Sequence, residues 1–184
     1  MVLTTRNMTY IALYTSLTIA ISVFTRFTAG VIPFSLLPLM VMLAGGILGS
    51  RLGLISILLY VLMGLLGIPV FAKPPFGGFA YVFQPSFGFL LGFILAAYLI
   101  GKIIEKGSDN ILTYLLANFI GIIVINVVGL LYFWFLFNSI LGKPMGLLDV
   151  IKIGFLPFIV PDLVKGVIAA YLSIATGKRL QLKI

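Results

Sequence analysis

Residues 111–139 read ILTYLLANFIGIIVINVVGLLYFWFLFNS and contain no charged side chain. A helix needs about 20 predominantly apolar residues to cross the hydrocarbon core of a bilayer. The stretch exceeds that length, so it predicts a membrane-spanning helix from about Ile111 to Ser139. This helix decides the class of fold.

The composition of the rest of the chain agrees with this interpretation. Of the 184 residues, 62% are hydrophobic and only 9% are charged, and the mean hydropathy is +1.28. These values lie outside the usual ranges of soluble domains. At about 20 residues per crossing, the chain has room for roughly six helices and little else. We therefore predict an all-α polytopic membrane protein, one domain over residues 1–184, with six transmembrane helices.

Several classes of function are excluded by residue inventory. The chain has no Cys and no His, which removes thiolate nucleophiles, imidazole bases and the common transition-metal sites. It has no G-x-x-x-x-G-K-[ST] motif for ATP, and its cations are scattered rather than gathered on one basic face for nucleic acid. Glu105 and Asp109 flank Lys106 in a short polar segment and are interpreted as a solvated turn. We expect neither an enzyme nor a bound cofactor or metal.

The other helices are expected at 8–24, 39–48, 52–66, 86–104 and 159–176, with Arg51 at the turn between the second and third. Segments 25–38, 67–85 and 141–158 are rich in Pro and Gly, so they are predicted to be loops or short interrupted structure. Pro33 and Pro38 place the start of the uncharged run 27–50 in the first of these loops. The expected bundle is therefore joined by three long segments and tight turns.

Lys and Arg are retained on the cytoplasmic side of membrane helices. With the N-terminus inside, seven cations fall on the cytoplasmic side and four outside. The inner set is Arg6, Arg51, Lys102, Lys106, Lys178, Arg179 and Lys183, and the outer set is Arg26, Lys73, Lys143 and Lys152. This asymmetry predicts that both termini are cytoplasmic and that the three long loops are on the outer face, where they would form a ligand-binding cup rather than a pore.

An acid and a base stand three residues apart in VPDLVKG, residues 160–166. A charge within a membrane span is costly, and by default it is functional. At the spacing i and i+3, Asp162 and Lys165 share one face of a helix. Two interpretations stay open: a self-contained structural pair, or a polar wall of a ligand site in which Asp162 accepts and Lys165 donates hydrogen bonds.

Three quoted segments carry a resemblance to a known family: IPFSLLPLMVMLAGGILGSRLG (32–53), LLGIPVFAKPPFGGFAYVFQPSFGFLLGFILAAYLIG (65–101) and VPDLVKG. Together they resemble the BioY family, the biotin-specific substrate-binding (S) components of energy-coupling factor (ECF) vitamin transporters. The resemblance implies a protein of the prokaryotic cell membrane that captures biotin from outside. It also implies two kinds of partner, a transmembrane coupling (T) subunit and two ABC-type ATPases. Asp162 and Lys165 fall on the family's ligand contacts, and the segment at Gly77 and Gly78 on its ligand-covering loop.

Further candidate residues lie in the third loop and in the first helix. The loop aromatics are expected to form an apolar wall for the ligand: Phe71, Phe76, Phe79 and Tyr81. Ala12, Ser16 and Ala20 form a small-xxx-small stripe, which permits close approach of another helix. That helix belongs either to the coupling subunit or to this chain. Asn118 and Asn126 share a face of their helix and either line the site or hydrogen-bond to another helix.

Two alternative functions remain open. Leu37 and Phe76 stand where the family often carries polar residues, which leaves an S component for a different vitamin. The second alternative is a self-sufficient secondary transporter or channel that uses Asp162 and Lys165 as a proton or ion relay. Inverted repeats would support it, and the two halves of the sequence show no convincing self-similarity.

Overall fold

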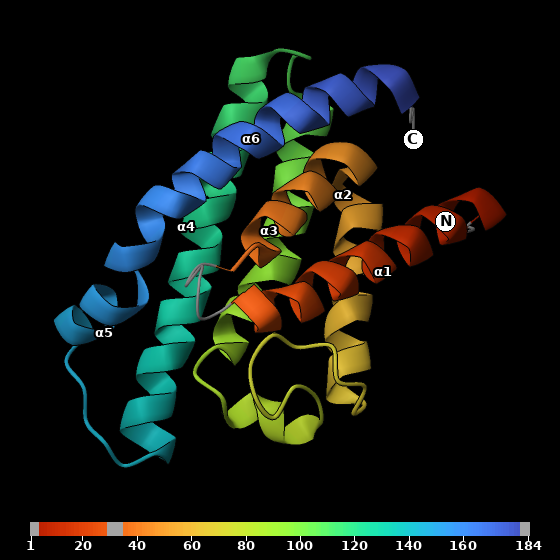
Figure 1. Ribbon diagram of the computed structural model, residues 1–184. Coiled ribbons are helices and arrows are strands. Elements are labelled where there is room, and N and C mark those ends of the chain that lie inside the picture. The colour runs from red at the N-terminus through yellow and green to blue at the C-terminus, as the bar shows by residue number, and fades with distance from the viewer. Residues whose placement is uncertain (1–3, 29–34, 181–184) are drawn as a thin grey trace.

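The computed structural model describes residues 4–28 and 35–180, and all regular structure in these two ranges is helical (Figure 1). Pro33 and Lys183 lie outside the described residues. The elements are α1 (Thr5–Thr28), α2 (Leu37–Leu65), η1 (a 3₁₀ helix, Phe79–Phe83), α3 (Phe87–Lys106), α4 (Ile111–Phe135), η2 (a π-helical turn, Leu136–Ile140), α5 (Leu147–Gly154) and α6 (Leu156–Leu180).

Five of the described helices are long and apolar enough to cross a membrane. The candidate spans are Thr5–Phe27, Leu37–Leu65, Phe87–Lys106, Ile111–Ile140 and Leu156–Thr176. The prediction of an all-helical, polytopic membrane protein is therefore confirmed for the described part of the chain. Length and composition give five candidate spans where the sequence predicted six, and the difference lies in α2.

Helix α2 is a hairpin rather than one straight helix. Its backbone leaves the helical region at Gly49, where φ is 80° and ψ is −179°. A Cβ added at Gly53 would lie 2.8 Å from the carbonyl oxygen of Ala44, so the arms 37–48 and 50–65 run back along each other (Figure 1). The arms are about 18 and 24 Å long at 1.5 Å per residue.

The sequence predicted these two arms closely but placed their turn at Arg51. The turn is at Gly49, because a positive φ is readily adopted only by a residue without a Cβ. Pro38 also differs from the prediction. It lies in the first turn of α2 rather than in a loop, where a residue without an N–H is tolerated.

Glu105 closes this hairpin. It is exposed, as the prediction of a solvated residue requires, but it lies in the last turn of α3 rather than in a loop, and its carboxylate has a structural role. Its Oε1 accepts a hydrogen bond from the backbone N–H of Ser50 at 2.6 Å, and its Oε2 accepts one from Ser50 Oγ at 2.8 Å. Glu105 belongs to α3, and its carboxylate caps the first backbone N–H of the second α2 arm. A negative charge at this position also suits the positive end of the helix dipole.

The two remaining interrupted segments carry more helix than expected. Segment 67–85 contains η1, and segment 141–158 contains α5 together with the first turn of α6. Helix α6 begins at Leu156 rather than near Ile159. Pro157 stands in its first turn, a position where the missing N–H of proline has no intrahelical partner in any case.

The packing of the helices places α6 against both α2 and α4, while α1 packs on α2, and α3 lies between α2 and α4. The long described connections, 66–86 and 141–146, gather at one end of the bundle, at the bottom of Figure 1. The turn at Gly49 and the short connection 107–110 lie at the other end. These two loops thus share one end of the molecule, as the predicted topology requires, whereas residues 29–34 of the remaining predicted loop, 25–38, lie outside the described residues.

Candidate ligand-binding site

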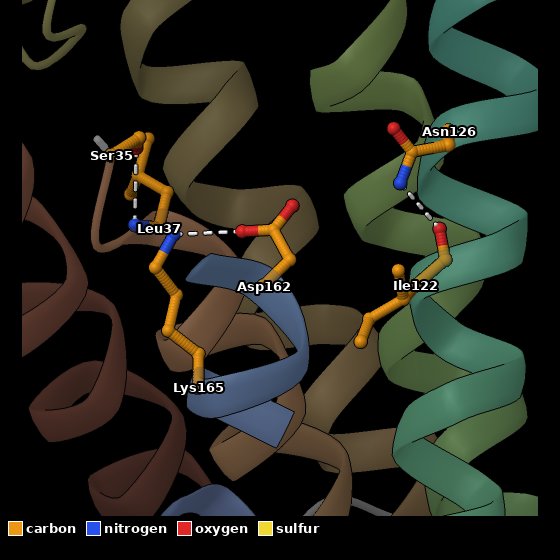
Figure 2. Close-up of polar contacts among 6 residues, drawn as sticks. All are labelled: Ser35, Leu37, Ile122, Asn126, Asp162 and Lys165. Atoms are coloured by element: carbon orange, nitrogen blue, oxygen red, sulfur yellow. Dashed lines mark hydrogen bonds and ion pairs between the residues drawn. The ribbon is translucent and has the colours of Figure 1, made fainter. Parts of the chain in front are cut away.

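The acid and base of VPDLVKG form an ion pair on α6. Lys165 Nζ donates a hydrogen bond to Asp162 Oδ1 at 2.7 Å, as Figure 2 shows. The residues are only 7% and 8% exposed. Their spacing of three residues puts both side chains on the same helical face, and this face is directed into the protein.

Helices α2 and α4 enclose the pair. In Figure 2 it lies between Leu37, in the first turn of α2, and Asn126 on α4. Directly after Lys165, a Cβ added at Gly166 would lie 3.4 Å from Ile122 Cδ1 and 3.9 Å from Met42 Sδ. The close packing of α6 against α2 and α4 therefore explains why the ion pair is buried.

The two asparagines of α4 have different roles. Asn118 Nδ2 donates to the carbonyl oxygen of Gly166 at 2.8 Å, so it is a helix-to-helix contact that holds α6. Asn126 Nδ2 donates to the carbonyl of Ile122, one turn earlier in its own helix. The Oδ1 atom of Asn118 is buried and has no hydrogen-bond partner among the described residues.

The ion pair keeps unused hydrogen-bonding capacity. Within the described part of the chain, its hydrogen bonding joins one carboxylate oxygen to one ammonium N–H. The second oxygen of Asp162 can therefore still accept, and Lys165 can still donate. A buried acceptor beside a buried donor suits a polar ligand that carries both N–H groups and oxygens.

Loop 66–86 is anchored by two of the predicted aromatic residues. Phe71 is fully buried, and its ring lies 4.1 Å from that of Tyr81 and 5.8 Å from that of Tyr60, measured between centroids. Tyr81 is 3% exposed and shares a 3.1 Å hydrogen bond with Ser86. Burial raises the pKa of Tyr81, so its phenol stays neutral. These two rings form the interior of the loop.

The other predicted loop residues lie around this anchor. The N–H of Gly78 donates to the carbonyl of Gly64 at 2.7 Å, and a Cβ at Gly77 would collide with the carbonyl oxygen of Ile68. Phe79 is 71% exposed. These contacts fasten the loop to α2 and to itself, and the role of its residues as a ligand wall stays a prediction.

The stripe of small residues on α1 faces outward. Ala12, Ser16 and Ala20 are all exposed, so the interpretation as packing within this chain is wrong. The opposite face of α1 is fastened to α2 by buried hydroxyl groups. Thr15 Oγ1 donates to the carbonyl of Ser56 at 3.0 Å, and Ser22 Oγ and the Tyr60 hydroxyl lie 2.9 Å apart.

Arg26 is a site residue that sequence reasoning missed, because it was counted only as a charge for topology. It stands in the last turn of α1. Its Nε donates to the carbonyl oxygen of Phe71 at 2.9 Å, and its Nη2 donates to that of Pro69. Nothing in the local sequence connects Arg26 with a loop more than 40 residues away.

Comparison with known proteins gives one consistent result. The model of the BioY family matches residues 1–182. A probable biotin transporter BioY of Lysinibacillus sphaericus is 37% identical over 170 residues, which cover 92% of this chain and 85% of that protein. The biotin transporter BioY of Thermotoga maritima is 34% identical over 149 residues, or 81% of this chain and 83% of that protein.

A solved structure agrees with these relatives. The crystal structure of the S-component for biotin from an ECF-type ABC transporter is similar to this chain with a TM-score of 0.76 and 25% sequence identity. The similarity covers 94% of this chain and 91% of that one.

Proposed function

Because this chain belongs to the BioY family, we propose that it binds biotin within the membrane as the S component of an ECF-type transporter. The family is one of transport components, so the chain is not an enzyme. The observation that carries the proposal is the Asp162–Lys165 pair of α6, which is buried and retains hydrogen-bonding capacity. Ionisable groups inside membrane spans are costly and mark substrate sites.

The chemistry of biotin matches this pair. Biotin has two ureido N–H donors, a ureido oxygen and a carboxylate around an apolar bicyclic ring. In our proposal Asp162 accepts from the ureido N–H groups, and Lys165 donates to one of the oxygens. The apolar wall and the cover come from loop 66–86, through Phe71, Phe76, Phe79, Tyr81, Gly77 and Gly78. A self-sufficient transporter or channel is not favoured, because the similar fold is that of an S-component.

We further propose the arrangement in the membrane. If each arm of α2 crosses separately, the chain crosses six times and both termini lie in the cytoplasm of a prokaryotic cell. The end of the bundle that carries loops 66–86 and 141–146 then faces outward, in agreement with the distribution of Lys and Arg. Translocation would depend on a T subunit and two ABC-type ATPases, and the exposed stripe on α1 is the proposed docking face.

The test of biotin binding compares two acid and base pairs of equal spacing. Asp162→Asn and Lys165→Met should each weaken biotin binding at least about tenfold, which corresponds to 1.4 kcal/mol. The matched controls are Asp149→Asn and Lys152→Met in α5, because both residues are exposed. Binding is measured on purified protein after gel filtration has shown that each variant is folded. Wild-type affinity in both α6 variants would exclude the pair as the site, and a wild type that retains another vitamin instead of biotin would exclude the substrate.

The orientation of the chain in the membrane is tested with single cysteine substitutions, since the sequence contains no cysteine. A membrane-impermeant thiol reagent should label Lys73→Cys and Lys143→Cys in intact cells and leave Lys106→Cys unlabelled. The opposite pattern would invert the topology.

Docking of the coupling subunit is tested by placing a bulky side chain on the exposed stripe of α1. Ala12→Trp should impair transport and capture of the T subunit while biotin binding is kept. Loss of biotin binding together with transport would contradict a role of the stripe in docking alone.

A further inference from the structure

Arg26 makes three contacts with loop 66–86. Two are the hydrogen bonds to the carbonyl oxygens of Phe71 and Pro69. In the third, the guanidinium carbon lies 4.5 Å from the centre of the Phe76 ring. A planar guanidinium can serve two carbonyls and an aromatic face together, which a lysine ammonium cannot do with the same geometry. The type of residue therefore matters as well as its charge.

The part of the loop that Arg26 contacts is a closed unit. The N–H of Phe71 donates to the carbonyl of Phe76 at 2.8 Å, and the N–H of Phe76 donates to that of Lys73 at 2.8 Å. Phe76 has a φ of 65°, a conformation that costs free energy in a residue with a bulky side chain. The surrounding contacts must hold Phe76 in place, and the guanidinium against its ring is one of them.

The loop is thus tied to two different helices. The ring of Phe71 and the N–H of Gly78 connect it to the second arm of α2, from whose end it continues. Arg26 connects it to α1, which is distant in sequence and packs on α2 through buried hydroxyl groups. Phe71 takes part in both ties, through its ring to α2 and through its carbonyl oxygen to Arg26 of α1. The segment 69–76 can therefore lift only when the contact with α1 is released.

We propose that Arg26 is a positioning residue that holds loop 66–86 closed against α1 and so controls the entry and release of biotin. This inference rests on the proposed function for the identity of the ligand and for the role of loop 66–86 as its cover. Arg26 itself need not touch biotin. Its effect on the ligand is exerted through the loop, so its removal should change rates more than affinity.

The first test uses no ligand. Val70 is 2% exposed and lies between two of the Arg26 contacts, so a single Val70→Cys reports loop opening through its rate of thiol labelling. Adding Arg26→Gln should raise this rate at least about tenfold, because labelling of a buried group follows the population of the open form. Adding Lys73→Gln, which removes an exposed charge in the same loop, should change the rate by less than about twofold.

Arg26→Lys keeps the charge and serves as the second variant. Val70→Cys should be labelled in this variant at a rate between those of the protein with Arg26 and of Arg26→Gln. A lysine ammonium cannot reproduce the two hydrogen bonds that the planar guanidinium donates. Arg26→Lys also keeps the proposal testable if Arg26→Gln does not fold. Labelling of a folded Arg26→Gln, or of Arg26→Lys in its place, at the wild-type rate would overturn the proposal.

The second test measures biotin kinetics on the Arg26 variants. In Arg26→Gln, the association and dissociation rate constants should both rise about tenfold while Kd stays within about threefold, since a residue that only gates access affects both directions. A higher dissociation rate constant with an unchanged association rate constant would show that Arg26 stabilises only the biotin-bound state. This result would overturn the gating role. Faster labelling with unchanged biotin kinetics would show that the loop does not control the ligand. Absence of biotin binding in the wild type would instead count against the proposed function and leave the labelling result intact.

Discussion

Two helices of this chain, α5 and α6, each carry an acid and a base three residues apart, but the two pairs differ in burial and in bonding. In α5, Asp149 and Lys152 are both exposed and form no ion pair with each other within residues 4–28 and 35–180. In α6, Asp162 and Lys165 are buried and bonded at 2.7 Å. Local spacing is therefore not what makes a pair of charges into a candidate site.

The two pairs differ because one lies on the exposed side of its helix and the other lies on the buried side. In α5 the buried positions are Val150 and Gly154, and the charges lie on the other side. In α6 the buried positions recur every three or four residues, and the charged pair belongs to that row: Asp162, Lys165, Gly166, Ala169, Ala170 and Ser173. A helix that packs against α2 and α4 buries whatever its inner face carries.

The largest expected effect is on stability and separates the two acids. Asp162→Ala should lower the free energy of unfolding of ligand-free protein by about 3 kcal/mol, because it leaves the Lys165 charge buried without its partner. Asp149→Ala should change it by less than about 0.5 kcal/mol, as is usual for exposed positions. Thermal unfolding in detergent measures both.

A double variant checks the cause. Adding Lys165→Met to Asp162→Ala should restore most of the lost stability, because the unpaired charge is then gone. If the double variant is no more stable than Asp162→Ala, loss of packing rather than charge explains the effect. Equal stability of Asp162→Ala and Asp149→Ala would remove the contrast between the two pairs.

An intermediate effect on stability is expected when the asparagines that hold α6 and the connection to α5 are replaced. Asn118 holds α6 through Gly166, whereas Asn138 holds the connection to α5 by exchanging hydrogen bonds with the backbone of Met145. Asn118→Ala should cost about 0.6–1.7 kcal/mol of global stability, between the average and the largest value for hydrogen bonds between membrane helices. Asn138→Ala should leave global stability unchanged and accelerate hydrogen exchange near Met145. The reverse ranking would mean that the α5 connection, not α6, is the better fixed segment.

The smallest effect is expected at Gly166, next to the buried pair. A Cβ there would meet Ile122, Asn118 and Met42 at 3.4 to 3.9 Å, which is ordinary van der Waals contact. Alanine is also favoured over glycine in a helix by about 1 kcal/mol. Gly166→Ala should therefore leave the melting temperature unchanged or raise it slightly. A clear drop would show that α6 approaches α4 more closely than the described distances allow.

Much of the fold could be predicted from local patterns. Long apolar runs located the helices, and Pro and Gly located the loops, since both signals act within a few residues. The turn at Gly49 was misplaced by two residues because the charge of Arg51 ends the uncharged run, and only the backbone shows which residue has a positive φ. The capping role of Glu105 was not predicted because its partner, Ser50, is 55 residues away in the sequence.

For the candidate site, the sequence singled out Asp162 and Lys165 because a charge in an apolar helix is conspicuous anywhere. The role of Arg26 was not predictable in this way. A cation at the end of an apolar helix is what topology alone requires, and its partners become visible only when loop 66–86 folds back on α1.

The sequence by itself determined that this chain is a helical membrane protein and where its apolar helices are interrupted, because hydrophobicity and backbone preference are properties of short segments. Only the tertiary structure decided which acid and base pair is buried, which face of α1 is free and what Arg26 holds. These three outcomes depend on how each helix is rotated against neighbours that are distant in sequence. Rotation is set by packing between segments, and no single segment contains that information.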